Sequence, residues 1–293
     1  MSKPSHIPVL VQEVVTLLDP KPNNILVDAT VGLGGHAIKL LERLGAQGRL
    51  IGIDQDEQAL QSAREYLKQY QDRLVLVRGN FRNLIQLVPS DIGSQGVDGI
   101  LIDLGVSSLQ LDEPTRGFSF LHNAPLDMRM DAGGSDLTAA DIVNQANFTE
   151  LVRILQEFGE EPKAESIAKR ILEFRKRRPI TTTFDLVEVV GGRPGKIHPA
   201  TRVFQALRIA TNQELQALSE VLPQAIELLR SGGKLAVISF HSLEDRIVKN
   251  FFKNQATGGR IKLLSKKAIA PSWEERKRNS RSRSAKLRIV EKI

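Results

Sequence analysis

Short apolar runs alternate with helical patterns over the first hundred residues of the chain. The apolar runs cover residues 25–27, 50–53, 74–77 and 99–102. Helix-spaced apolar positions follow the first two runs. Strands that alternate with helices predict a doubly wound parallel sheet, and unbroken apolar strands predict that helices cover both of its faces. The expected fold class is therefore α/β.

This alternation stops after the fourth strand, where turn-rich sequence and then several short helical patterns follow. Thr149 and Thr183 are the candidate N-caps of two of these helices. We therefore expect a mainly helical, inserted substrate-recognition domain, residues 109–199. It would interrupt an α/β domain formed by residues 1–108 and 200–293.

The last third of the chain is predicted to return to the sheet. Residues 200–230 form one long helical pattern that we expect to bend or divide near Pro223. Strands are expected at residues 234–240 and 284–293, and Ser242 is expected to cap a helix after the first of them.

A glycine-rich turn, Asp28-Ala-Thr-Val-Gly-Leu-Gly-Gly-His36, joins the first strand to its helix. Glycines let a main chain approach a ligand closely, and a helix that starts there directs backbone N–H groups toward an anion. Asp54 ends the second strand, about where a nucleotide-binding fold places a ribose-binding carboxylate. The spacing Gly32-x-Gly34-x-x-Ala37 also fits NAD-binding proteins, and a tight turn without a ligand is a third interpretation.

Composition limits the chemistry further. The chain has 293 residues, 41% of them hydrophobic and 26% charged, which is ordinary for a globular protein. With no cysteine and five histidines, it offers no disulfide, no thiolate ligand and no cysteine nucleophile, and no dedicated metal site is expected. The sequence contains no secretory signal and no apolar run of the ~20 residues that a membrane helix needs, so we expect a cytoplasmic protein.

The formal net charge of +7 is concentrated in one segment. Eleven lysines and arginines but two acidic residues lie between Arg260 and Arg288, so the rest of the chain is slightly acidic. A concentrated basic segment indicates a polyanionic partner, most often nucleic acid; a solvated basic tail is the alternative. Residues 272–284 are polar enough to be mobile until that partner binds. Residues 175–178 have the same two interpretations, a phosphate contact or a solvated helix end.

Nine sequence blocks in one order extend over nearly the whole chain. They are Pro8–Glu13, Asp28–His36, Asp103–Asp112, Arg116–Phe120, Pro125–Asp131, His198–Arg202, Phe204–Ile209, Ile238–Arg246 and Arg281–Arg288. Together they resemble the bacterial family that methylates N4 of a cytidine in small-subunit (16S) ribosomal RNA, the MraW/RsmH-like methyltransferases. Two departures are small: Leu109 stands where the family often has proline, and Ala37 where serine is common.

The resemblance implies a Rossmann-like class I methyltransferase sheet with an inserted helical domain, and S-adenosylmethionine as the cofactor. The positions that match the family's cofactor contacts are Gly34, Gly35, His36, Asp54, Phe81, Asp103 and Gln110. At most of these positions the residue type suits the contact that the resemblance implies, because a carboxylate accepts hydrogen bonds from ribose hydroxyls and an aromatic ring stacks on adenine. For Gln110 only the resemblance supports the assignment.

Asp103, at the end of the fourth strand, is the candidate catalytic residue. The cytosine amino group is a poor nucleophile, and a carboxylate that accepts its N4–H would favour the nitrogen geometry that attacks a methyl group. The alternative is that Asp103 binds the cofactor alone. The target base must leave any stack to react, which predicts a deep pocket near Asp103.

The expected partner is small-subunit rRNA or the small ribosomal subunit, with no membrane and no DNA. The helical insertion and the basic segment would hold the RNA, and the substrate-binding candidates are His241, Arg129, Arg281 and Arg283. His241 has a second interpretation as a helix-entry residue bonded to the backbone, and Arg129 as part of a loop ion-pair network with Asp127 and Asp131. An NAD-dependent oxidoreductase and a non-catalytic RNA-binding assembly factor remain the alternative functions.

Overall fold

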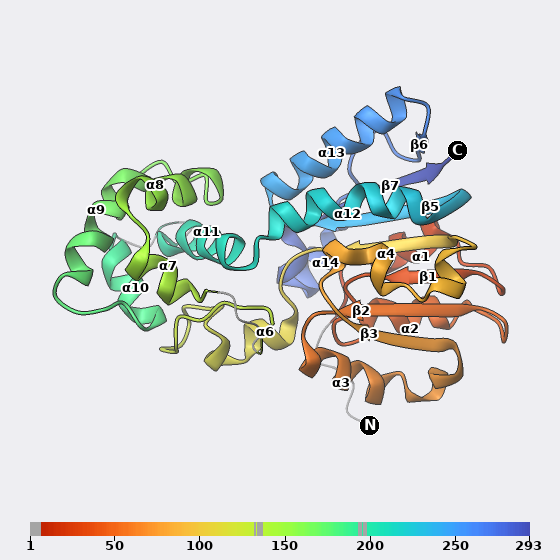
Figure 1. The fold of residues 1–293 in the computed structure, drawn as a ribbon, viewed down its shortest axis with the longest axis horizontal. Coiled ribbons are helices and arrows are strands. Elements are labelled where there is room, and N and C mark those ends of the chain that lie inside the picture. Colours follow the sequence, from red (N-terminus) through yellow and green to blue (C-terminus); the bar gives the residue numbers. More distant parts are fainter. Residues whose placement is uncertain (1–6, 132, 134–136, 193–194, 196–197) are drawn as a thin grey trace. The chain divides into compact units, whose positions relative to one another are not determined.

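The computed structural model describes residues 7–131, 133, 137–192, 195 and 198–293, and the chain forms two compact units (Figure 1). The sheet unit comprises Met1–Gly105 and Leu215–Ile293, and the helical unit comprises Val106–Glu214. Two connections between the units follow from this division, as expected for an insertion. Within the described residues, no helix combines the length and apolar character needed to cross a bilayer.

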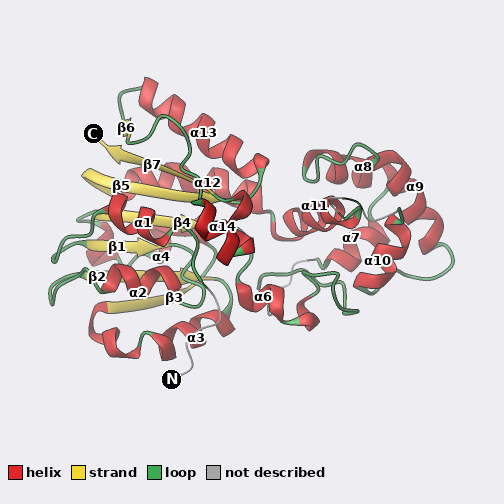
Figure 2. Ribbon diagram, turned by 180° about the vertical axis from the view of Figure 1, so that it is seen from behind, coloured by secondary structure: helices red, strands yellow, loops and turns green. Residues whose placement is uncertain are grey.

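The sheet unit contains one seven-stranded sheet (Figure 2). Its strands are β1 (Ile25–Asp28), β2 (Arg49–Asp54), β3 (Leu74–Arg78), β4 (Val97–Asp103), β5 (Leu229–Ser239), β6 (Ile261–Leu263) and β7 (Lys286–Lys292). Their order is β3-β2-β1-β4-β5-β7-β6. The first five are parallel, and β7 runs antiparallel to both β5 and β6. The predicted α/β class with a Rossmann-like parallel sheet is confirmed.

Helices cover both faces of the sheet because successive side chains in each strand point to opposite sides. Leu26 packs with the helices α1 (Val11–Leu18), α2 (Gly35–Leu41) and α3 (Glu57–Tyr66). Val27, the next residue, belongs to the core on the other face, which contains α4 (Leu84–Leu87), α5 (Ser90–Gly93), α12 (Glu214–Leu228) and α13 (Ser242–Thr257). This burial on both faces explains the unbroken apolar strands of the sequence.

The helical unit has its own core. Its helices are α6 (Ser108–Asp112), α7 (Ala139–Gln145), α8 (Phe148–Glu157), α9 (Ala164–Arg175), α10 (Thr183–Val190) and α11 (Ala200–Asn212). Leu151, Ile167 and Leu207, from three of these helices, are among the residues that form one buried cluster. Asn147 caps α8 and Thr182 caps α10, so both N-caps expected from the sequence, at Thr149 and Thr183, were wrong by one or two positions.

The helical pattern over residues 200–230 divides at a different place from the one predicted. Gln213 has a left-handed backbone (φ 50°) that ends α11, whereas Pro223 lies inside α12. The apolar face of α11, including Val203 and Phe204, packs in the core of the helical unit. That unit therefore extends to Glu214, beyond the boundary at residue 199 that the sequence suggested.

The C-terminal basic segment is ordered, contrary to the expectation of mobility at residues 272–284. It forms α14 (Trp273–Arg278) and a 3-10 helix, Ser280–Ser284. Asn279 is buried between them, and its amide donates to the carbonyl of Ile7 at 2.8 Å. The Ser282 hydroxyl, also buried, donates to the carbonyl of Asn279 at 2.8 Å. The Asn279 bond ties the segment to Ile7 near the start of the chain, and the Ser282 bond stabilises the turn within the segment.

Candidate active site

Three aspartates end neighbouring parallel strands of the sheet. Asp28 ends β1, Asp54 ends β2 and Asp103 ends β4, and β1 lies between the other two strands. Because these strands are parallel, all three carboxylates lie at the same edge. This is also where the strand order reverses, the place at which open α/β sheets bind ligands.

The glycine turn after β1 is shaped by contacts within the protein. Gly34 has φ 85° and precedes α2, and a Cβ on Gly35 would lie 2.7 Å from Pro8 Cγ. Packing and backbone conformation therefore account for these two glycines, whether or not a ligand binds. Among the described residues, a Cβ on Gly32 would meet only the Thr30 carbonyl, at 3.9 Å, so this position faces open space and its φ of 51° favours glycine.

Asp54 fixes the glycine turn and keeps room for a further donor. Its Oδ2 accepts from the N–H of Gly32, and its Oδ1 from the N–H of Asp56, both at 2.9 Å. A backbone hydrogen bond from Gln55 also contributes. A carboxylate has about four acceptor positions, so one remains. Burial raises the pKa of Asp54 to about 6, although the backbone donors oppose that shift.

His36, Asp28 and Asp103 form a buried cluster beside the turn. His36 Nε2 lies 3.4 Å from Asp103 Oδ2, and the Asp103 N–H donates to Thr30 Oγ1 at 2.7 Å. Asp103 Oδ1 and Asp28 Oδ2 are buried without a hydrogen-bond partner among the described residues. Such orphaned acceptors need an explanation, and a bound ligand that donates to them is one.

The cluster is electrostatically coupled. Burial raises the pKa of Asp28 to about 7, against the opposing effect of His36. Burial lowers the pKa of His36, but the contact with Asp103 and the charge of Asp28 outweigh it, so that the pKa of His36 is raised overall.

These shifts predict that the free energy of unfolding decreases as the pH rises from about 4 to about 7. A carboxyl group whose pKa is raised in the folded state binds more protons there than in the unfolded chain, as Asp28 and Asp54 do. The raised pKa of His36 acts in the same direction, because its stabilising charge is lost as the pH increases. Denaturant titrations at several pH values should show that the free energy of unfolding depends less on pH in Asp28→Asn than in the original chain. An equal pH dependence in the two proteins would contradict the assignment to Asp28. The control is Asp91→Asn, which removes an exposed carboxyl group.

Two further predicted cofactor residues lie in different units. Phe81 follows β3, begins a short 3-10 helix and packs partly buried against the core of the sheet unit. Gln110 belongs to the helical unit, where Gln110 and Ser107 form the capping box of α6. The buried amide of Gln110 also approaches the Met130 carbonyl, at 3.5 Å. Its structural role is thus defined, and its cofactor role stays a prediction.

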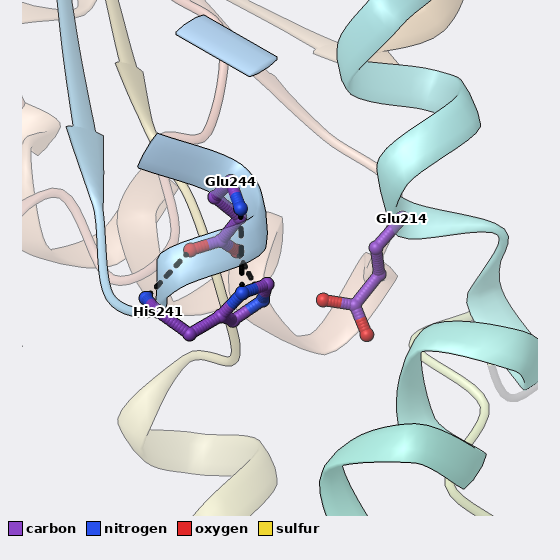
Figure 3. A group of neighbouring side chains, drawn as sticks. All are labelled: Glu214, His241 and Glu244. Carbon is purple, nitrogen blue, oxygen red and sulfur yellow. Dashed lines mark hydrogen bonds and ion pairs between the residues drawn. The ribbon is translucent and has the colours of Figure 1, made fainter. Parts of the chain in front are cut away.

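His241 caps a helix. It follows β5 and is the N-cap of α13, with Nδ1 accepting from the Glu244 N–H at 3.4 Å (Figure 3). The buried Glu244 carboxylate accepts in turn from the N–H groups of Phe240 and His241, at 2.7 and 3.2 Å. The capping box therefore begins at His241, one residue before the predicted Ser242. This geometry agrees with the interpretation of His241 as a helix-entry residue bonded to the backbone, and a contact between His241 and substrate stays a prediction.

The predicted RNA-binding arginines differ in how far they are engaged. Arg129 forms a bidentate ion pair with Asp127, with both N–O distances 2.8 Å, and this pairing lowers the pKa of Asp127 despite its partial burial. Arg281 is half-buried and Arg283 is exposed. Of the other basic residues in the segment, Lys286 and Arg288 pair with Asp245, at 2.9 and 2.7 Å.

Asp28 is the site residue that the sequence interpretation did not single out. It lies within the glycine-rich turn block and is the acidic residue that ends an apolar strand. The same signal, an acid at the end of an apolar strand, identified Asp54 and Asp103. Applying that signal to the first strand would have found it. Its proximity to His36 and Asp103 could not be found this way, because it depends on the packing of β1 against β4.

The sequence profile described as the MraW methylase family matches residues 3–293. The chain is 49% identical to "Ribosomal RNA small subunit methyltransferase H" of Heliobacterium mobile, covering 98% of this chain and 99% of that protein. It is 48% identical to the protein of the same name from Geobacter sp. (strain M21), with 98% of each covered. Among solved structures, a putative rRNA-methylase from Clostridium thermocellum aligns with a TM-score of 0.50 at 14% identity, over 98% of this chain and 100% of that one. This last likeness concerns the fold alone.

Proposed function

This chain belongs to the MraW methylase family, and from that premise we propose that it methylates the N4 amino group of a cytidine in the decoding region of small-subunit (16S) rRNA. Its activity is that of an S-adenosylmethionine-dependent rRNA methyltransferase. The observation that carries the proposal is the near-complete match to relatives at 46–49% identity that are named as small-subunit rRNA methyltransferases. Specificity for cytosine N4 is the finer part, which the resemblance of the sequence blocks supports.

The cofactor is S-adenosylmethionine, which rules against the NAD interpretation of Gly32-x-Gly34-x-x-Ala37. The edge of the sheet fits this cofactor in two respects. Gly32 faces open space, and Asp54 keeps an acceptor position for a ribose hydroxyl. Gly34, Gly35 and His36 would bind the methionine end, and Phe81 would cover the adenine. The role of Gln110 rests on the resemblance.

S-adenosylmethionine supplies a methyl carbon that its positively charged sulfur makes strongly electrophilic. The task of the protein is then to hold N4 in line with that carbon, and orientation of this kind lowers a barrier by ~7–11 kcal/mol. The methyl group would pass from sulfur to N4, and N4 would give up one proton. We assign the acceptor of that N4–H to the carboxylate of Asp103, whose side chain is 21% exposed at the end of β4. His36, with Nε2 3.4 Å from Asp103 Oδ2, positions the carboxylate.

The RNA is expected to bind through exposed cations, with phosphate contacts setting affinity and base contacts setting specificity. Arg281 and Arg283 belong to the ordered basic segment and Arg129 to the helical unit. Because Arg129 already pairs with Asp127, a phosphate would have to share or displace that partner. Arg283, which is exposed, is therefore the strongest of the three candidates.

Mass mapping of methylated cytidines in small-subunit rRNA tests the proposed function. Cells that lack the protein should lose one N4-methylated cytidine, and the purified protein with S-adenosylmethionine should restore it. Naked rRNA and assembled small subunits are tested as separate substrates. Loss of binding to the subunit with no change in any methylated nucleotide would favour the non-catalytic assembly factor. A methyl group found on a different base atom would refute N4 specificity alone.

A further inference from the structure

Trp273 is the only tryptophan of the chain, and its side chain is exposed. Its relative exposure is 69%, the second largest among the exposed large hydrophobic side chains of the described residues. Single exposed apolar residues are common and need no function by themselves. Two independent features of its surroundings make this one informative.

The first feature is the rigidity of its support. Trp273 begins α14, whose first turn is capped by Ser272 accepting from the Glu275 N–H at 3.1 Å. The Glu275 carboxylate accepts from the Leu10 N–H at 2.8 Å, and Asn279 anchors the other end of the helix to Ile7. The indole is thus presented from a fixed helix, so little conformational entropy is lost when it binds a partner.

The second feature is the surrounding charge. Lys277 Nζ lies 5.2 Å from the centre of the Trp273 ring, and Arg276, Lys277 and Arg278 are exposed on the same helix. Of the two acidic residues, Glu275 is partly buried and bonded to the backbone of Leu10, whereas Glu274 is exposed. Arg276 and Lys277 follow Trp273 by three and four residues and so share its side of the helix, which Glu274 and Arg278 do not. The side of α14 that carries the indole is therefore cationic.

Phe184, the other exposed aromatic side chain among those described, provides a contrast. It is 48% exposed, but α10 carries no basic residue, and its acidic residues Asp185 and Glu188 pair with Arg178. The helix that carries Phe184 therefore offers no cation for a flanking phosphate. The surroundings of Trp273 combine an aromatic face, on which a base can stack, with cations for the flanking phosphates. Proteins that bind single-stranded nucleic acid use this combination.

We propose that Trp273, together with Arg276 and Lys277, forms a stacking platform for an unpaired base of the RNA substrate. This platform is additional to the methylation site, and it rests on the proposed function in so far as the partner is rRNA. Stacking holds one base of any identity, since every base has a π-face, and the cations hold its backbone. The platform would thus position the RNA without choosing the cytidine.

The single tryptophan makes the platform directly observable, because all tryptophan fluorescence of the protein comes from it. Titration with a short single-stranded RNA from the substrate region should quench this emission. An RNA of the same length without bases keeps the phosphates and should bind without that quenching. Trp273→Ala should raise the dissociation constant, measured by fluorescence anisotropy of labelled RNA, about tenfold, and Trp273→Phe less. Ile85→Ala removes an exposed apolar side chain outside the basic segment and should bind normally.

Unchanged emission at saturating RNA, or normal binding by a folded Trp273→Ala protein, would overturn the proposal. Quenching by small subunits but not by their deproteinised RNA would also overturn it, in favour of a contact with a ribosomal protein. Methyl transfer is measured on the same preparations. Methylation without quenching would refute only the platform, whereas quenching without methylation would refute only the proposed catalysis.

Discussion

Replacement of Asp103 by asparagine is expected to lower the rate of methyl transfer at saturating S-adenosylmethionine by about 10²–10⁴-fold, the range typical of a lost general base. An amide of the same shape keeps the strand end and the N–H contact with Thr30. It cannot accept the N4–H in the way a carboxylate does, because it carries no negative charge. Single-turnover transfer of a labelled methyl group to small-subunit rRNA measures this step.

The same variant separates the two roles considered for Asp103. If Asp103 acts on the amine, the dissociation constant for S-adenosylmethionine, measured by calorimetry, should change far less than the rate. A weakened affinity with a normal rate at saturation would show that Asp103 binds the cofactor alone. Asp91→Asn removes an exposed carboxylate from the same unit and should alter neither quantity.

Much of the sheet could be predicted because its signals are local. Each buried strand is a short apolar run, and β2 and β4 end in the aspartates expected at the ligand-binding edge. The alternation of strands with helices dictates that these strands are parallel, which places Asp54 and Asp103 at one edge without further information. The contact between His36 and Asp103 is different, because it depends on the order β2-β1-β4 and on the path of the turn.

The division between α11 and α12 could not be predicted because its cause is not a recognised breaker. Gln213 adopts a left-handed backbone (φ 50°), a conformation that sequence rules assign to glycine or asparagine. Pro223 carried the stronger signal and yet lies within a continuous helix. The helical periodicity of α11 also does not indicate whether its apolar face packs in the core of the sheet unit or in that of the helical unit. The choice of core determined where the helical unit ends.

The basic segment shows how composition can mislead. Its average charge suggested a mobile tail, but two uncharged residues, Asn279 and Ser282, are buried and hydrogen-bonded. Order in this segment therefore depends on side chains that a count of charges overlooks. For function the difference is large, because a fixed helix presents Trp273 and its neighbouring cations in one arrangement.

Replacement of Asp54 by asparagine is expected to weaken S-adenosylmethionine binding by roughly 10–100-fold, because hydrogen bonds to a charged group contribute about 1.5–3 kcal/mol. The pH dependence makes this prediction specific. The pKa of Asp54 is about 6 because the group is buried, and ribose hydroxyls donate only to its unprotonated oxygens. Cofactor affinity should therefore rise as the pH increases through about 6, and this rise should be smaller in Asp54→Asn, where the group no longer titrates.

The control for this experiment is Asp91→Asn, which removes an exposed carboxylate from the same unit. Unlike Asp56, whose charge contributes to the raised pKa of Asp54, Asp91 is not among the groups that shift it. The affinity and pH profile of Asp91→Asn should follow those of the original chain. Burial also raises the pKa of Asp28, to about 7, so the decisive quantity is the difference between the profiles of Asp54→Asn and the original protein. Because Asp54 also holds the glycine turn through Gly32, thermal unfolding of both variants distinguishes a lost ribose contact from a collapsed turn. Identical profiles in a folded Asp54→Asn protein would remove Asp54 from the cofactor site.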